Sequence, residues 1–250
     1  MSDHIDISRD GAVQIIRMNR PDKKNALTRD MYKAMADALV SGDKDGDIRC
    51  HLFLGLPDVF TAGNDIADFM MAAQGGAGTG AEVQAFLRAI ITVSKPMLAG
   101  VDGMAIGVGS TMLLHCDMVL ASKNARFKTP FLDLGLLPEA GSTLIGPRAM
   151  GYKAAFSLLA MGEELGPDDA KDAGLVSKII EDGDFEAAAI AAAHRVAERP
   201  PEAMALTRRL LRGDVDEIVA RMEEESSYFA ERLMSKEAQN AFMAFMSRGK

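Results

Sequence analysis

The sequence has few cysteines and no long apolar run, and both shortages exclude classes of protein. Its two cysteines, Cys50 and Cys116, lie in apolar or mixed stretches without metal-ligand spacing, so we interpret them as reduced packing residues in a cytosol-like compartment. No run of about 18 apolar residues occurs, which argues against a membrane-spanning helix. The start, MSDHIDISRDG, lacks a basic stretch followed by an apolar one, so we expect no signal peptide and a cytoplasmic protein.

Positive charge is also scarce. The 250 residues carry 28 basic and 36 acidic side chains, for a net charge of −8. This balance argues against nucleic acid or an anionic membrane surface as the main partner, although a local basic patch could still bind a phosphate. With 48% hydrophobic and 26% charged residues, the composition is that of a globular protein with one large core, or one core and an appendage.

Three common binding or catalytic motifs are missing as well. The glycine-rich run at 75–80 is not followed by the Lys-Ser/Thr pair of a phosphate-binding loop, and we interpret it as a mobile lid or variable loop. Ser110 lacks the second glycine of a nucleophile elbow, which argues against a serine nucleophile. The histidines have no partner at ligand spacing, so we assign no metal site to any of them: His4, His51, His115 and His194.

What the chain does contain is an alternation of strand and helix patterns. Strands are predicted at 12–19, where apolar residues cluster, and at 48–54, where they recur at every second position. Thr28 is expected to cap a helix whose apolar side chains, Met31, Met35 and Leu39, recur every four residues. The same patterns predict helices at 82–93, 111–115 and 152–161, and strands at 96–101, 117–121 and 175–180.

From residue 185 onward the pattern is helical only. Helices are predicted at 187–198, 202–212, 215–229 and 236–246. Strands alternating with helices, followed by helices alone, indicate an α/β core over 1–190 and a helical region over 191–250. The helical region carries one-sided apolar side chains that need another surface to cover them, which favours self-association: Ile218, Met222, Phe229 and Leu233.

Three glycine-bearing segments, at 60–65, 103–109 and 128–148, contain the candidate site. The last holds Glu139 in an otherwise nearly uncharged stretch, where burying a carboxylate without a partner would be costly. Local sequence alone leaves two interpretations of Glu139, a catalytic acid or a carboxylate at the start of a helix beginning near Ala140. Asn64, in the first segment, is by itself a residue that tolerates a left-handed turn.

Taken together, these segments resemble a known family. FTAGNDIADF, GMAIGVGSTMLLHCDMVLAS and FLDLGLLPEAGSTLIGPRAMG, in this order and at these separations, are similar to the enoyl-CoA hydratase/isomerase (crotonase) superfamily, as are NRPDKKNALT and GEELGPDDAKDAGLV. The pattern is closest to Δ3,Δ2-enoyl-CoA isomerases. The resemblance implies a spiral of ββα turns with a helical trimerisation region, a homotrimer or hexamer, and a role in fatty acid metabolism. It implies an acyl-CoA thioester as the substrate, with coenzyme A as part of it and no prosthetic group.

The resemblance also implies site residues. The backbone amides of Asn64 and Val108 would hold the thioester oxygen as it becomes negative, and Glu139 would move the proton. The coenzyme A part would lie along Ala62, Asn64, Asp65, Ile66 and Val108, with Lys24 near its phosphates. Asp65 is more simply a loop-stabilising residue, and basic side chains such as Lys23, Lys24, Arg248 and Lys250 are more simply a solvated charge run. The 69–80 stretch would cover the acyl chain.

The acids that are missing distinguish the possible reactions. Hydratases of this family carry two glutamates, at the positions where this sequence has Thr111 and Phe131. One carboxylate is enough for a 1,3-proton shift, and an apolar surround should raise the pKa of Glu139. We therefore expect an isomerase. The alternatives are weak hydration, ring-opening isomerisation, decarboxylation, or a non-catalytic acyl-CoA-binding protein. Asp133 is expected to be solvated or bonded within its loop, and an RNA-binding role finds no support in the acidic composition.

Overall fold

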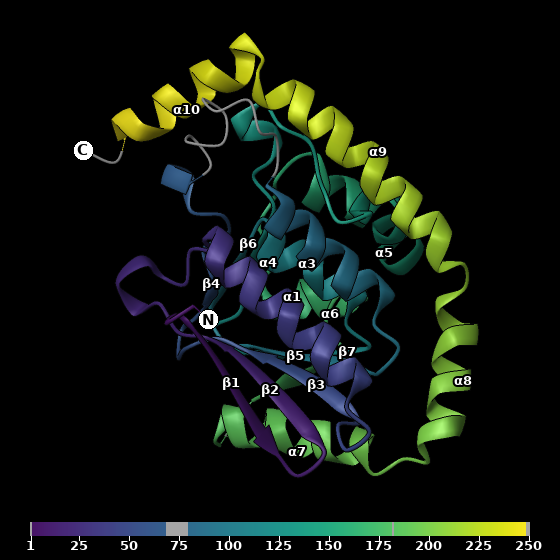
Figure 1. Cartoon of the computed structure of the whole chain (residues 1–250). Coiled ribbons are helices and arrows are strands. Elements are labelled where there is room, and N and C mark those ends of the chain that lie inside the picture. The colour runs from purple at the N-terminus through teal and green to yellow at the C-terminus, as the bar shows by residue number, and fades with distance from the viewer. Residues whose placement is uncertain (1, 69–79, 182, 249–250) are drawn as a thin grey trace.

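Six strands form the larger sheet of the computed structural model, which describes residues 2–68, 80–181 and 183–248 (Figure 1). The strand order is β1-β2-β3-β5-β7-β9. Only β1 and β2 pair antiparallel, and the other neighbours pair parallel. The bounds are β1 Ile5–Asp10, β2 Val13–Met18, β3 Cys50–Leu54, β5 Met97–Val101, β7 Met118–Ser122 and β9 Lys178–Ile180. Of these, β1 has a mostly exposed, polar sequence and was not predicted.

Both faces of this sheet are covered, which is why β3 is buried along its whole length. Cys50, Leu52 and Leu54 pack with α7 (Phe185–Ala197) on one face. Phe53 points to the other face, which α1 (Arg29–Lys44) and α3 (Ala81–Thr92) cover. Figure 1 shows α7 below the sheet and the other two helices above it. The predicted cap of α1 is present, since Thr28 Oγ1 accepts a hydrogen bond from Met31 N at 3.4 Å.

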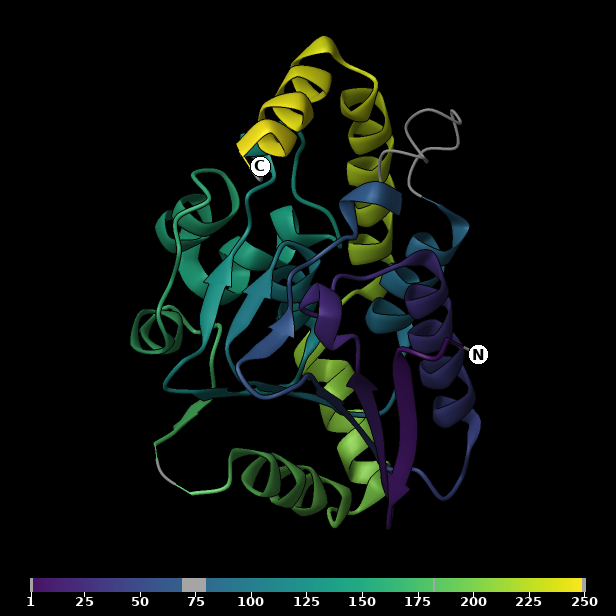
Figure 2. The ribbon, with the colours of Figure 1, turned by 90° about the vertical axis from the view of Figure 1, so that its left-hand side faces the viewer.

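A second sheet holds three very short parallel strands, in the order β4-β6-β8, which lie side by side in Figure 2. They are β4 Val59–Thr61, β6 Met104–Ile106 and β8 Arg126–Lys128. Each follows directly after a strand of the larger sheet, so β3-β4, β5-β6 and β7-β8 form successive turns of one spiral. This arrangement brings the chain segments that leave β4 and β6 next to each other.

Further helices of the core connect these strands. They are η1 Pro21–Lys23, α4 Val108–Thr111, η2 Met112–His115, η3 Leu132–Leu134, α5 Ser142–Leu159 and α6 Pro167–Asp172. The helix predicted at 152–161 is the second half of α5, which starts ten residues earlier and is kinked at Gly151, where φ is 73°. The apolar pattern does not reveal the first half, which Gly146 and Pro147 interrupt, although a helix beginning near Ala140 was one of the two interpretations of Glu139.

Three helices form the C-terminal region: α8 Pro201–Arg212, α9 Val215–Leu233 and α10 Lys236–Arg248. In Figure 1 they follow one side and the top of the molecule as an arc. Ile218 and Met222 pack into the main core, and Phe229 and Leu233 pack with Phe131. The surface that this apolar stripe needs is therefore supplied by the same chain, so the stripe gives no support to self-association, which stays a prediction.

Within the described residues, no helix combines the length and apolar character needed to cross a membrane.

Candidate active site

Two backbone amides lie at equivalent points of neighbouring strands. Thr61 of β4 pairs with Ala105 of β6, and Asn64 and Val108 each lie three residues further along. Among the described residues, neither the N–H of Asn64 nor that of Val108 has a hydrogen-bond acceptor. Val108 also begins α4, so its N–H belongs to the positive end of that helix. Two adjacent, unused donors are what a negatively charged oxygen requires.

Gly63 explains how the two segments approach so closely. Its φ is 84°, a left-handed value that disfavours other residues. A Cβ atom at this position would lie 2.8 Å from the backbone oxygen of Ile106. Glycine at position 63 therefore serves both the turn and the contact between the two strands.

Tyr32 fixes the side chain of Asn64. Its hydroxyl, carried by the buried face of α1, donates a hydrogen bond to Asn64 Oδ1. Burial, and after it the charge of Glu139, raises the pKa of Tyr32 well above its ordinary value, so the phenol stays protonated as a donor. Tyr32 was not predicted, because its place among the apolar positions of the helix gives no signal of a polar role.

Glu139 is buried, with 6% of its surface exposed. Thr111 Oγ1 donates a hydrogen bond to Glu139 Oε1 at 2.5 Å. Burial raises the pKa of Glu139 to about 7, against the hydrogen bond from Thr111, which lowers it, and with the charge of Glu225, which raises it further. The carboxyl group is therefore turned inward, and its pKa lies near neutral pH, as a general acid–base group requires.

The helix-start interpretation of Glu139 does not describe what its side chain does. At the start of α5, Gly141 N and Thr143 N donate instead to the carboxylate of Glu225, which comes from α9. The carboxyl group of Glu139 bonds to Thr111 of α4. Glu225 is a buried polar residue that was not predicted, since it lies among apolar positions of α9.

The turn that carries Glu139 has an unusual backbone. Ala140 has a φ of 66° and Gly141 one of 69°, so two consecutive residues are left-handed, and the first is not glycine. His115 Nε2 lies 2.7 Å from the carbonyl oxygen of Ala140 and donates to it. Burial lowers the pKa of His115 to about 3, so this ring is neutral at physiological pH. The His115 bond helps to hold the left-handed turn beside the acid.

A mainly apolar pocket of about 150 Å³ lies next to these groups. It is lined by Ala62, Gly63, Asn64, Ile66, Ile106, Gly107, Pro130, Phe131, Leu134, Leu136, Phe229 and Phe242. Three of the predicted binding residues, Ala62, Asn64 and Ile66, are among them, whereas Val108 and Glu139 are not. The two phenylalanines from α9 and α10 were not predicted. They show that the C-terminal helices form part of the pocket wall.

Comparison with known proteins identifies the family. The sequence model described as enoyl-CoA hydratase/isomerase matches residues 8–250. The chain belongs to the enoyl-CoA hydratase/isomerase family. This confirms the predicted family, the enzyme class and the α/β crotonase-like fold.

Relatives in this family differ in the reactions that their names state. Enoyl-CoA delta isomerase 2 of Rattus norvegicus is 35% identical over 247 residues, which span 97% of this chain and 63% of that protein. The chain therefore matches less than two thirds of that relative's length. A short-chain-enoyl-CoA hydratase of Clostridium acetobutylicum is 29% identical over 247 residues, spanning 98% of this chain and 95% of that protein. OdaA of Pseudomonas aeruginosa has a solved structure with a TM-score of 0.92 and 40% identity, covering 98% and 99% of the two chains.

The other predicted binding residues, Lys24 and Asp65, lie beside the same pocket. Lys24 is exposed and left-handed, and its carbonyl oxygen accepts a hydrogen bond from Ala62 N at 2.9 Å, which places it beside the pocket. Asp65 forms a 2.6 Å ion pair with Arg20 and accepts a hydrogen bond from Ala67 N. Burial acts to raise the pKa of Asp65, but these bonds hold it below its ordinary value. Asp65 thus stabilises the loop.

Some predictions fall on parts of the family fold that the structure does not describe. In the 69–80 stretch that was expected to cover the acyl chain, residues 69–79 lie outside the described part of the chain, and so does Lys250. The side chain of Arg248 is also outside them. Asp133 is described and is exposed.

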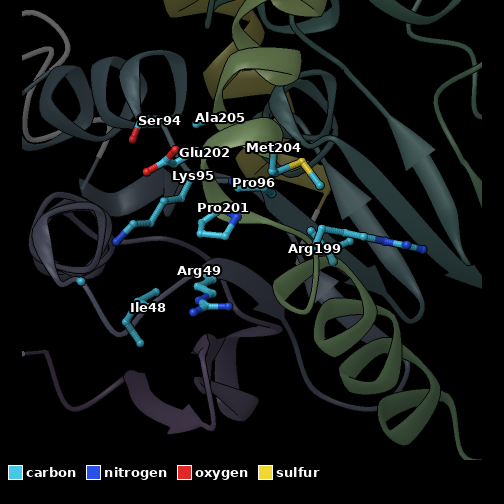
Figure 3. A pocket seen from close by; sticks show the side chains of 12 residues that line it. Ile48, Arg49, Ser94, Lys95, Pro96, Arg199, Pro201, Glu202, Met204 and Ala205 are labelled. Carbon is cyan, nitrogen blue, oxygen red and sulfur yellow. The ribbon is translucent and has the colours of Figure 1, made fainter.

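A second cleft, of about 320 Å³, lies where α8 begins (Figure 3). Arg49, Lys95 and Arg199 line it, but Lys95 and Arg199 extend to opposite sides in Figure 3. Lys95 Nζ also donates to the carbonyl oxygen of Gly42 at 2.7 Å. These cations do not converge on a common anion. Within the described part of the chain, no group of three or more His, Cys, Asp or Glu has the geometry of a metal site.

Proposed function

We propose that this protein is an enoyl-CoA isomerase that moves a carbon–carbon double bond of an unsaturated fatty acyl-CoA through a thioester enolate. The observation that carries the proposal is the buried carboxyl group of Glu139, whose pKa is raised to about 7. Thr111 and Phe131 stand where hydratases of the family carry their glutamates, so a single acid must serve the reaction. A double-bond shift needs only one.

In the proposed reaction, Glu139 both removes the proton and returns it. Its carboxylate removes a proton from C2 of a 3-enoyl thioester, and the electrons move onto the thioester oxygen to form a dienolate. The N–H groups of Asn64 and Val108 stabilise that oxygen, and losing one such donor typically costs about 3–4 kcal/mol of barrier. Glu139 then returns the proton at C4, which leaves a 2-enoyl thioester and restores the carboxylate.

The binding of coenzyme A belongs to this proposal as well. Lys24, Ala62, Asp65 and Ile66 lie along the edge where the nucleotide part would run, and the apolar pocket beside Asn64 would take the start of the acyl chain. Coenzyme A enters and leaves with the substrate, and we propose no prosthetic group. The similarity to enoyl-CoA delta isomerase 2 supports this choice of substrate.

We also propose that the protein assembles as a homotrimer or hexamer through its C-terminal region, and that it works in the cytoplasm. Support for assembly comes from α8, where Leu206, Leu210 and Leu211 are exposed. Adjacent exposed leucines on a helix are costly for an isolated molecule in water.

The test is an incubation with 3-enoyl-CoA and with 2-enoyl-CoA in deuterated water. We expect deuterium at C2 and C4 without an added hydroxyl group, and a fall in kcat of at least about 100-fold for Glu139→Gln, because general acid–base groups contribute about that much. Asp133→Asn removes a nearby exposed acid as the matched control and should leave the rate unchanged. A 3-hydroxyacyl product, or near-normal isomerisation by Glu139→Gln, would rule the proposal out.

A further inference from the structure

Glu225 is a second buried glutamate beside the site, and it comes from a distant part of the chain. Only 2% of its surface is exposed. Its carboxylate accepts hydrogen bonds from Gly141 N at 2.6 Å, from Thr143 N at 2.9 Å and from Thr143 Oγ1 at 2.6 Å. The donors belong to the N-cap and the second residue of α5, two and four residues after Glu139.

These hydrogen bonds cap the start of α5, which no side chain close to it in the sequence does. The first N–H groups of a helix have no partner inside the helix, and a side chain at the N-cap usually accepts one of them. The N-cap of α5 is Gly141, which has no side chain, and Glu139 bonds to Thr111 instead. Glu225 therefore replaces the missing local cap. It does so at a turn in which Ala140 and Gly141 are both left-handed.

We propose that Glu225 is a positioning residue for Glu139: it fixes the 139–143 turn from α9 and keeps a negative charge beside the proton-transferring carboxyl group. The inference rests on the proposed function of Glu139 and goes beyond it. It assigns α9 a part in catalysis in addition to its part in packing.

The charges around both glutamates define what Glu225 does. Glu139 is faced by Tyr32 from α1, Thr111 from α4 and Glu225 from α9, while His115 from η2 is neutral and holds the Ala140 carbonyl oxygen. Glu225 itself is faced by Thr143 of α5 and by Arg221, one turn earlier on α9.

Burial raises the pKa of Glu225 above its ordinary value, while three donors, a helix N-terminus and an arginine act in the opposite direction and favour its ionised form. Its negative charge opposes ionisation of Glu139. Glu225 thereby helps to hold the pKa of the acid near neutrality while it fixes the backbone on which that acid is carried.

The experiment compares Glu225→Gln with Glu223→Gln. Glu223 is exposed on α9, two residues before Glu225, and pairs with Arg88. Its substitution removes the same charge from the same helix. For Glu225→Gln we expect the acidic limb of the kcat/KM pH profile to move to lower pH, and the plateau kcat to fall by about tenfold as the turn loosens. Glu223→Gln should match the wild type in both.

A readout without substrate separates this inference from the proposed function. The infrared band of the protonated Glu139 carboxyl group, identified by its loss in Glu139→Gln, should titrate at lower pH in Glu225→Gln than in the wild type. That shift stands even if the enzyme proves to catalyse another reaction. An unchanged band and an unchanged limb would overturn the inference, as would an equal shift in Glu223→Gln.

Glu225→Asp is a second test of the positioning role, and it serves if Glu225→Gln does not fold. The shorter side chain retains the charge but cannot reach all three donors in the same way. We expect the acidic limb to stay near its wild-type position while the plateau kcat falls. A plateau equal to that of the wild type would overturn the positioning role.

Discussion

Two buried glutamates lie close to one turn, and their hydrogen-bond partners separate their roles. Glu139 accepts a single hydroxyl hydrogen bond, from Thr111, and has a pKa raised to about 7. Glu225 accepts three hydrogen bonds and neighbours Arg221. Each of these donors stabilises the charged form of Glu225 and opposes the rise in its pKa that burial causes. Glu139, the more lightly bonded of the two, is suited to exchange protons.

At the scale of single residues, Thr111 is expected to influence the pKa of Glu139. Its hydrogen bond lowers the pKa of Glu139, so Thr111→Val should raise that pKa further. Less carboxylate would then be present at neutral pH, and the acidic limb of kcat/KM should move to higher pH. A hydrogen bond to a charged group is worth about 1.5–3 kcal/mol, so we expect a loss of about tenfold at pH 7.

The same loss should shrink at alkaline pH, where Glu139 is ionised in both proteins. Thr111→Ser keeps the hydroxyl group and serves as the control, with a profile close to that of the wild type. A Thr111→Val enzyme whose limb stays in place would show that the bond does not set the pKa.

At the scale of elements, the site depends on the close approach of the segments that leave β4 and β6. Gly63→Ala adds a methyl group at a left-handed residue, 2.8 Å from a backbone oxygen. We expect it to lower the free energy of unfolding by about 1–3 kcal/mol and to reduce kcat by displacing the Asn64 amide. Urea unfolding and steady-state kinetics measure the two effects.

Gly46→Ala is the matched control for that substitution. A methyl group added at Gly46 would meet nothing within 4 Å, and this glycine does not have a left-handed φ, so its change should stay within about 0.5 kcal/mol. Equal stability of the two variants would contradict the close approach of the two segments at Gly63.

The sequence predicts long elements well and short ones poorly. The helix capped by Thr28 and the strand around Leu52 have enough residues to reveal their period. The strands β4, β6 and β8 have three residues each, too few for any period, and they are defined by pairing with distant partners.

Predictability within the site follows the same division. Asn64, Val108 and Glu139 could be proposed as site residues because they lie in motifs that are continuous in sequence, and their roles stay predictions. Tyr32 and Glu225 could not, because each reaches the site across a tertiary contact from a helix whose own pattern is apolar. Their roles become visible only once α1 and α9 are packed against the loops.

At the scale of the whole molecule, the division into 1–190 and 191–250 stays a prediction, and the two parts are closely joined. Arg208 of α8 is buried and donates from Nε to both carboxylate oxygens of Asp117, at 2.9 and 2.8 Å, and from Nη1 to the carbonyl oxygen of Val93 at 2.7 Å. Glu225 and Phe229 of α9 add a cap and a pocket wall. The C-terminal region is thus part of the core structure of the single chain.

The outer face of α8 remains available for assembly. Leu210 and Leu211 are 77% and 82% exposed. We expect Leu210→Lys combined with Leu211→Lys to lower the oligomeric state in sedimentation velocity, because charged groups would have to be buried at the contact. Val40→Lys, at an exposed apolar site on α1, is the control and should leave it unchanged. A double variant that sediments like the wild type would exclude this face.

The cap from α9 to the Glu139 turn has a consequence for anyone who recombines members of this family. A chimera that takes its strands from one parent and its last helices from another would inherit an acid from the first and the electrostatic surroundings of that acid from the second. Such a hybrid could fold and still work at a different optimum pH. In the proposed mechanism, the acid and the residue that positions it are therefore divided between the middle and the C-terminal part of the sequence.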